Sequence, residues 1–189
     1  PILTAYFVLI GDDYSKIDEL ELKIKASEPY GNVEAEALAV NNIDLEKHNL
    51  EADTLDRLAA ADKLREFLKK HKGKSKSDRL VPLGHNVSFD IKMINEQLIA
   101  EKEWDQYISY AIRDTKPVCD FLKDFELLPP EIGNLGSLVK HLNVPKGIAH
   151  TAKDDVLMTI EAYRKLGEMV KSLSLGSGLS IDVLDILEK

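Results

Sequence analysis

The chain opens with two short segments whose hydrophobic patterns are typical of β-strands. Residues 2–10 (ILTAYFVLI) are apolar, with β-branched and aromatic side chains, as in a buried strand. Gly11-Asp12-Asp13 then predicts a turn, and residues 20–24 alternate apolar with charged side chains. Together these segments predict a β-hairpin with one covered face.

Helical and strand-like patterns alternate along the rest of the chain. The strongest helical pattern covers residues 54–68, where Leu58, Ala61, Leu64 and Leu68 would share one buried face. Further helices are predicted at 35–40, 89–98, 117–122, 135–142 and after Thr151, and further strands at 80–83 and 108–112. An Asn- and Asp-rich linker follows the first of these helices. This order predicts an α/β fold in which helices flank a mixed β-sheet.

Length and composition indicate a single domain. At 189 residues, with 44% hydrophobic and 31% charged residues, the chain can form a substantial core. Residues 1–171 are predicted to be this domain, and residues 172–189 a Ser- and Gly-rich linker with a short amphipathic tail. The tail carries Ile181, Leu184 and Leu187, and it is a candidate surface for contact with a second subunit in a homodimer.

Charge and cysteine content narrow the function classes. The net charge of −8 argues against a protein that coats duplex nucleic acid, but not against an enzyme with a nucleic-acid cleft. Cys119 is the only cysteine, which excludes an intrachain disulfide and a cysteine-based metal site. The apolar start is too short to span a membrane and lacks the features of a signal peptide. We therefore expect a cytoplasmic protein without membrane contact.

The densest positive patch of this acidic chain lies at residues 69–76 (KKHKGKSK), after the strongest helical pattern. Two interpretations stay open for it. One is a solvated connector, since charge runs are commonly exposed loops. The other is a flap that attracts the phosphate groups of a ligand. The sequence favours the first interpretation without excluding the second.

Residues 150–155 (HTAKDD) lead into the last helical pattern. Thr151 and Asp154 have the spacing of a capping box, so Thr151 is the expected N-cap. His150 would then lie in the loop before the helix and Asp155 in its first turns, where both can face one cleft. A capped surface helix with a chance histidine is the simpler alternative.

A second candidate carboxylate follows the predicted strand at 80–83. Residues 84–98 (GHNVSFDIKMINEQL) predict a turn and then a helix, with Asp90 at the helix start. A helix N-terminus favours the ionised form of such a carboxylate. Carboxylate oxygens are the ligands that hard ions such as Mg²⁺ prefer. Taken alone, Asp90 is more simply explained as a capping residue.

The two motifs together closely resemble those of the DnaQ-like (DEDDh) family of 3′–5′ exonucleases. The matching positions are Asn86-x-x-Phe89-Asp90 and, sixty residues after Asp90, His150-x-Ala152-x-x-Asp155. The resemblance covers nearly the whole chain, including the hairpin. It implies a ribonuclease H-like fold, with a mixed five-stranded sheet flanked by helices.

The resemblance also implies a role for each matched residue. Asp90 and Asp155 would be ligands of a two-ion Mg²⁺ or Mn²⁺ site, which in this family activates a water against the terminal phosphodiester. His150 would be the general base that takes the proton from this water. Asn86 and Phe89 would shape the substrate pocket and the helix cap beside it.

One motif of the family is not found. Its Asp-x-Glu at the end of the first strand has no counterpart, since residues 2–10 lead directly into the hairpin. Either the central strand that carries this motif is absent from the sequence, or the chain is a non-catalytic relative that kept the scaffold. We favour the first explanation, because losing a central strand leaves the backbone groups of its neighbours unpaired. Asp114, at another strand end, is a second-rank candidate with an expected structural role.

We therefore expect a metal-dependent 3′–5′ exonuclease that acts on single-stranded or frayed 3′ ends of DNA or RNA and releases nucleoside 5′-monophosphates. The alternative from another class is a non-catalytic module that binds nucleic acid or a protein. A third interpretation is an unrelated α/β domain in which these residues only cap helices. The presence of Asp90, His150 and Asp155 favours the enzyme, since a binding module needs no general base.

Overall fold

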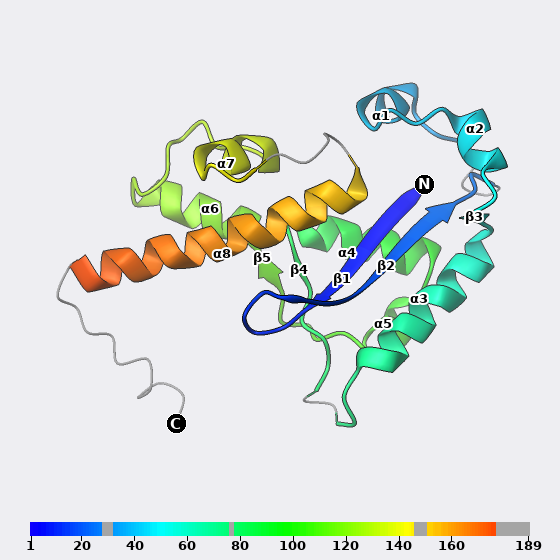
Figure 1. Cartoon of the computed structure of the whole chain (residues 1–189), viewed down its shortest axis with the longest axis horizontal. Helices are drawn as coiled ribbons and strands as arrows, with labels where there is room; N and C mark the ends of the chain where they lie inside the picture. Colours follow the sequence, from blue (N-terminus) through cyan, green and yellow to red (C-terminus); the bar gives the residue numbers. More distant parts are fainter. Residues whose placement is uncertain (28–31, 76–77, 146–150, 177–189) are drawn as a thin grey trace.

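The computed structural model describes residues 1–27, 32–75, 78–145 and 151–176. They form an N-terminal hairpin followed by alternating helices and short strands (Figure 1). The strands are β1 (Thr4–Ile10), β2 (Lys16–Ile24), β3 (Thr54–Leu55), β4 (Leu83–Gly84) and β5 (Arg113–Asp114). The helices are α1 (Ala35–Val40), α2 (Leu45–Leu50), α3 (Arg57–His71), α4 (Val87–Gln97), α5 (Glu101–Trp104), α6 (Thr115–Asp124), α7 (Leu135–His141) and α8 (Ala152–Gly176). The first predicted linker is wrong, because α2 lies in it. Helix α8 continues through residues 172–176 of the second predicted linker, and the rest of that segment lies outside the described residues.

The predicted hairpin is confirmed. β1 and β2 pair antiparallel along almost their whole length. At the turn, the Gly11 amide donates a hydrogen bond to the Ser15 carbonyl (2.9 Å), and Tyr14 has a φ of 63°, in the left-handed region. Leu22 and Ile24 are fully buried in the core that α3 and α4 complete. The alternation of apolar and charged residues thus predicted the covered face correctly.

Helix α3 begins later than its pattern predicted, and its buried face differs at one position. Asp56 is the N-cap, and Arg57 is the first helical residue. Leu64 and Leu68 are buried as expected, whereas Leu58 is 78% exposed. Leu58 precedes Leu64 by six residues, which places the two side chains about 120° apart around the helix. The prediction that Leu58 faces the core is therefore wrong.

The five strands form two separate sheets. β1, β2 and β3 make one sheet in that order, and β4 pairs with β5 in the other. β3 runs parallel to β2, and β4 runs parallel to β5, so the larger sheet is mixed. The mixed α/β class is confirmed. The single five-stranded sheet implied by the family resemblance is not observed among the described residues.

One edge of β1 has no strand partner among the described residues. The Leu3 carbonyl accepts a hydrogen bond from the Ile24 amide (2.7 Å), and bonded and non-bonded pairs alternate along an antiparallel ladder. Thr4, Tyr6 and Val8 therefore direct their backbone N–H and C=O groups away from β2. This edge is open to pairing with another strand.

β4 has a similar open edge within the described part of the chain. The Pro82 carbonyl accepts a hydrogen bond from the Arg113 amide of β5 (2.8 Å). By the alternation of a parallel ladder, Leu83 directs its backbone groups away from β5. Both sheets thus end in an unpaired strand edge.

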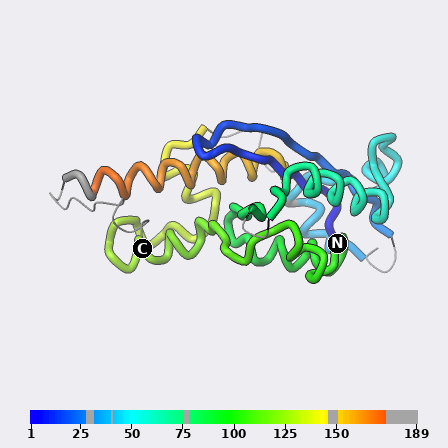
Figure 2. The backbone as a smooth tube through the Cα atoms, turned by 90° about the horizontal axis from the view of Figure 1, so that it is seen from below, coloured from blue at the N-terminus to red at the C-terminus, as the bar shows by residue number. Residues whose placement is uncertain are grey.

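Helices cover both faces of the hairpin, so the prediction that only one face is covered is wrong. α3 and α4 complete the core on the face with Leu22 and Ile24, and α8 lies on the opposite face, which carries Tyr6. Figure 2 shows the hairpin and α8 along one side of the molecule and α4, α5 and α6 along the other. α8 also contacts β4, α6 and α7, so it connects the two sheets.

A second hydrophobic cluster lies where α6, α7 and α8 meet. Its buried members include Cys119, Leu122, Leu138, Val139, Ala162 and Leu166. This cluster accounts for the predicted helices at 117–122 and 135–142, because most of their apolar residues lie in it, although Phe121 is exposed. Across the described ranges, no helix has the apolar length that crossing a membrane requires.

The assigned face of α3 can be tested with a pair of variants. We expect Leu64→Ala to lower the free energy of unfolding by about 2–5 kcal/mol, because Leu64 is fully buried. The matched control is Leu58→Ala, which should change the free energy of unfolding by less than about 0.5 kcal/mol because Leu58 is exposed. Urea unfolding followed by circular dichroism measures both. Equal losses would contradict the assigned face.

Candidate functional site

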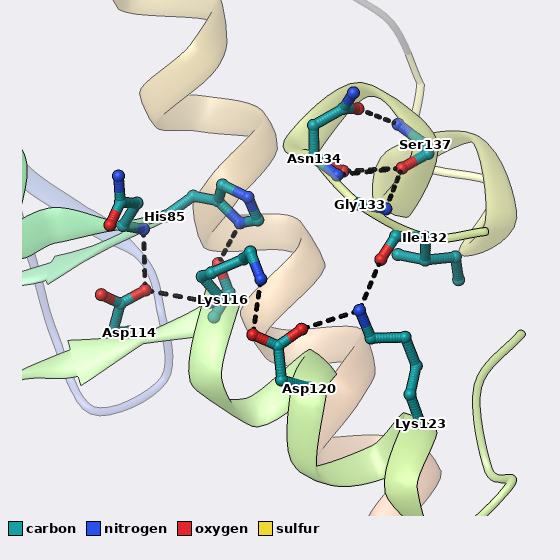
Figure 3. A network of polar contacts seen from close by, with 11 residues as sticks. His85, Asp114, Lys116, Asp120, Lys123, Ile132, Gly133, Asn134 and Ser137 are labelled. Carbon is teal, nitrogen blue, oxygen red and sulfur yellow. Dashed lines mark hydrogen bonds and ion pairs between the residues drawn. The ribbon is translucent and has the colours of Figure 1, made fainter. Parts of the chain in front are cut away.

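The carboxylate of Asp114 holds together the elements around the candidate site (Figure 3). One oxygen accepts hydrogen bonds from the amides of Asn86 (2.8 Å) and Lys116 (2.9 Å), and the other accepts one from the amide of Val87 (3.0 Å). Asp114 ends β5 and is the N-cap of α6, whereas Asn86 and Val87 begin α4. The carboxylate therefore ties the start of α4 to the end of β5, and the expected structural role of Asp114 is confirmed.

His85 and Thr115 form a polar contact that the sequence analysis did not identify. The Thr115 hydroxyl donates to the Gly84 carbonyl (3.2 Å) and lies 2.8 Å from His85 Nδ1. Because the hydroxyl has one proton, Nδ1 is the donor in the second contact. Burial lowers the pKa of His85, which favours the neutral ring with Nε2 unprotonated. The position of His85 directly before the Asn-x-x-Phe-Asp motif was the signal available for finding it.

The two residues predicted to contact substrate lie at the start of α4. Asn86 has a φ of 62° and is the N-cap residue, but its side chain makes no capping hydrogen bond. The amides of Asn86 and Val87 bind Asp114, so this helix N-terminus is already occupied by a carboxylate. Phe89 is 59% exposed, so its ring is accessible to a ligand. Asn86 thus occupies the N-cap position without a side-chain cap, and substrate contact by both residues stays a prediction.

Asp90 lies in the first turn of α4, where the sequence placed it. The residue is exposed, yet the protein atoms around its carboxylate desolvate it and raise its pKa. The negative charge of Asp114 acts in the same direction. The pKa of Asp90 is therefore shifted in the opposite direction to the lowering expected at a helix N-terminus, because desolvation is the larger effect. A bound cation would favour the ionised form.

The first turn of α8 has the predicted cap. Thr151 Oγ1 accepts a hydrogen bond from the Asp154 amide (3.1 Å) and donates one to the Asp154 carboxylate (2.7 Å). Asp155 is half-buried and lies one turn before the buried Thr159, on the same helix face. This is one of the two faces with which α8 packs on the rest of the protein, and it also carries the buried Ala162 and Leu166. The predicted base, His150, lies outside the described residues.

Metal binding by Asp90 and Asp155 stays a prediction. Within the described ranges, no group of three or more His, Cys, Asp or Glu is placed to hold an ion. Asp90 and Asp155 have the oxygen donors that Mg²⁺ and Mn²⁺ prefer. The sequence contains Asp-x-Glu at residues 44–46 and 124–126, but these lie at the start of α2 and the end of α6. Neither follows a strand, so neither replaces the first motif of the family.

The basic segment at residues 69–76 is helical in its first part. α3 extends to His71, so these positive charges lie at a helix C-terminus, where they are favourable. Lys70 Nζ and His71 Nε2 each lie 2.7 Å from the Asp18 carboxylate on β2. These two contacts hold the pKa of Asp18 well below its usual range. Lys70 and His71 thus connect α3 to the hairpin, and a phosphate-attracting role for the rest of the segment stays a prediction.

No protein-family model matches the chain, and no curated protein sequence matches it. The similarity to DnaQ-like exonucleases therefore depends on the two motifs and their positions. The assignment of function in turn depends on where the structure places Asp90 and Asp155.

The hydrogen bonds and the charge of Asp114 predict that one substitution changes both the stability of the protein and the pKa of Asp90. Asp114→Asn keeps the size of the side chain but weakens its bonds to the three amides, so the free energy of unfolding should fall by about 1.5–3 kcal/mol. It also removes a charge that raises the pKa of Asp90, so this pKa should fall in an NMR carboxyl titration. The exposed Asp124 at the end of α6 provides the control Asp124→Asn, which should change neither quantity. An unchanged pKa of Asp90 in Asp114→Asn would refute the coupling.

The buried contact of His85 predicts a dependence of stability on pH. Its folded-state pKa lies below the unfolded value of about 6.5, so the unfolded chain binds the proton more readily. The wild type should therefore lose stability as the pH falls from about 6.5 towards the folded pKa, and keep it above about 6.5. In His85→Gln, the difference in unfolding free energy between about pH 7.5 and about pH 5.5 should be smaller. The exposed His141 on α7 gives the control His141→Gln, which should retain the wild-type difference.

Proposed function

We propose that this protein is a metal-dependent 3′–5′ exonuclease of the DnaQ-like type, which hydrolyses the terminal phosphodiester of single-stranded or frayed nucleic acid. Asp90 and Asp155 would hold Mg²⁺ or Mn²⁺, and two such ions, when bound, stabilise the attacking and leaving oxygens. His150, directly before the N-cap of α8, would take the proton from the attacking water. The exposed ring of Phe89 would contact the terminal base.

The orientation of Asp155 is the observation that carries the proposal. Thr151 and Asp154 already complete the cap of α8. Asp155 is not needed for that purpose, yet it lies half-buried on a packed face of the helix. This favours a functional carboxylate over the alternative of a capped surface helix.

The position of Asp90 supports the same interpretation. α8 contacts β4, and β4 leads through Asn86 into α4, whose first turn carries Asp90. The hydrogen bonds to Asp114 hold this helix start in place. The two carboxylates therefore belong to the first turns of two helices that both adjoin β4. Figure 1 shows α8 crossing β4 in this region.

The open edges of β1 and β4 suit a further strand between the two sheets. Such a strand would pair with the edge formed by Thr4, Tyr6 and Val8 and with the edge at Leu83. One continuous sheet of the ribonuclease H-like type would result. In DnaQ-like exonucleases the first strand is central and ends in Asp-x-Glu. We propose that this strand provides the remaining metal ligands.

The alternative function is a non-catalytic module that binds nucleic acid or a protein on the same scaffold. The observation that favours it is the lack of a complete ligand group in the described part of the chain. Both functions are consistent with a cytoplasmic protein that contacts no membrane. A homodimer formed through residues 181–187 stays a separate proposal, because this tail lies outside the described residues.

Release of nucleotides from a labelled end distinguishes the two functions. The full-length protein is incubated with Mn²⁺ and a 3′-labelled single-stranded oligonucleotide, with and without a synthetic apolar strand peptide that ends in Asp-x-Glu. We expect labelled nucleoside 5′-monophosphate to be released, and Asp155→Asn and His150→Ala to slow the release by at least about 100-fold.

The neighbouring carboxylate provides the matched control. Asp154→Asn removes the same charge one residue away and keeps an acceptor for the Thr151 hydroxyl, so it should retain the wild-type rate. Binding of the oligonucleotide is measured in parallel by fluorescence anisotropy. Undiminished binding without any release, in the presence and absence of the peptide, would refute the exonuclease and favour the binding module.

A further inference from the structure

The polar face of the hairpin contacts the first turn of α8 through Lys153. Its Nζ lies 4.0 Å from the Glu19 carboxylate and 5.2 Å from the centre of the Tyr6 ring. The Tyr6 hydroxyl donates a hydrogen bond to Glu19, and Lys16 Nζ lies 2.9 Å from the same carboxylate. β1, β2 and α8 thus meet at Glu19.

Helix geometry relates this contact to the candidate site. Lys153 and Asp155 are two residues apart, which places them about 200° apart around the helix. With Lys153 on the hairpin, Asp155 is directed to the other side of α8. Further along the helix, the rings of Tyr14 and Tyr163 pack with their centres 6.2 Å apart. α8 is therefore attached to the hairpin at two points, and Lys153 is the one beside Asp155.

We propose that Lys153 is a positioning residue, which holds the first turn of α8 on the hairpin and so directs the Asp155 carboxylate inward. The role of Asp155 as a metal ligand rests on the proposed function. The contact by which Lys153 holds the first turn of α8 does not depend on that function. Tyr6 is buried, which gives the ammonium group a fixed aromatic surface. The Tyr6 hydroxyl lowers the pKa of Glu19, and Lys16 and Lys153 add to this, so Glu19 stays charged near neutral pH.

The expected effect is local. An exposed ion pair and a cation–π contact at the surface are both weak interactions. Their loss should loosen the first turns of α8 without unfolding the protein. The Asp155 amide, which donates to the Thr151 carbonyl (3.0 Å), reports directly on this turn.

Amide hydrogen exchange of the full chain, followed by NMR, measures this loosening. Lys153→Met keeps the apolar stem but removes the charge, and the amides from Asp155 to Thr159 should exchange about three- to tenfold faster. The amide of Leu166 should keep its rate. Lys153→Arg should restore the wild-type rates, because it retains the positive charge. Lys16→Met is the matched control, since it removes the other cation at Glu19 without touching α8.

Addition of Mn²⁺ distinguishes a failure of the positioning role of Lys153 from a failure of the proposed metal-dependent function. In the wild type, paramagnetic broadening of the Asp155 amide reports an ion at this carboxylate, and Lys153→Met should need several-fold more Mn²⁺ for the same broadening. Exchange rates that are equal in wild type and Lys153→Met, or that rise equally in Lys16→Met, would overturn the positioning role. If exchange responds as expected but no broadening occurs at Asp155, the positioning role stands and the metal-dependent function fails.

Discussion

The rest of the candidate site depends on the three hydrogen bonds that backbone amides donate to the Asp114 carboxylate. Bonds from amides to an ionised acceptor are stronger than those between neutral groups. Here they join segments 28 residues apart, because Asp114 ends β5 whereas Asn86 precedes α4. They fix the helix start that carries Asp90 and the exposed Phe89. The contact between His85 and Thr115 reinforces the same junction from the β4 side.

α8 connects the two halves of the protein because it has two packing faces. One face, with Lys153 and Tyr163, lies on the hairpin. The other face, with Ala162 and Leu166, completes the cluster of α6 and α7. Because α8 contacts both the hairpin and β4, it fixes the position of the hairpin relative to β4. Its first turn, which carries Asp155, is held by a cap on one side and by the hairpin on the other.

Under the proposed function, the division into two sheets and the lack of a complete ligand group among the described residues have one common explanation. Two strand edges carry unpaired backbone groups within the described residues, and a single inserted strand would satisfy both. The same strand would bring carboxylates to the place between Asp90 and Asp155. A partner without such carboxylates could pair with these edges as well, which would yield a binding module and not an enzyme.

The sequence by itself determined the local features of this protein. The hairpin with its buried Leu22, the helices at 35–40 and 135–142 and the cap at Thr151 depend on residues that are close together in the chain, so patterns and spacing predict them. The tertiary structure alone decided the division into two sheets, the bonds to Asp114 and the raised pKa of Asp90. Each of these depends on desolvation or on partners far away in the sequence, and no local pattern records which distant groups will meet.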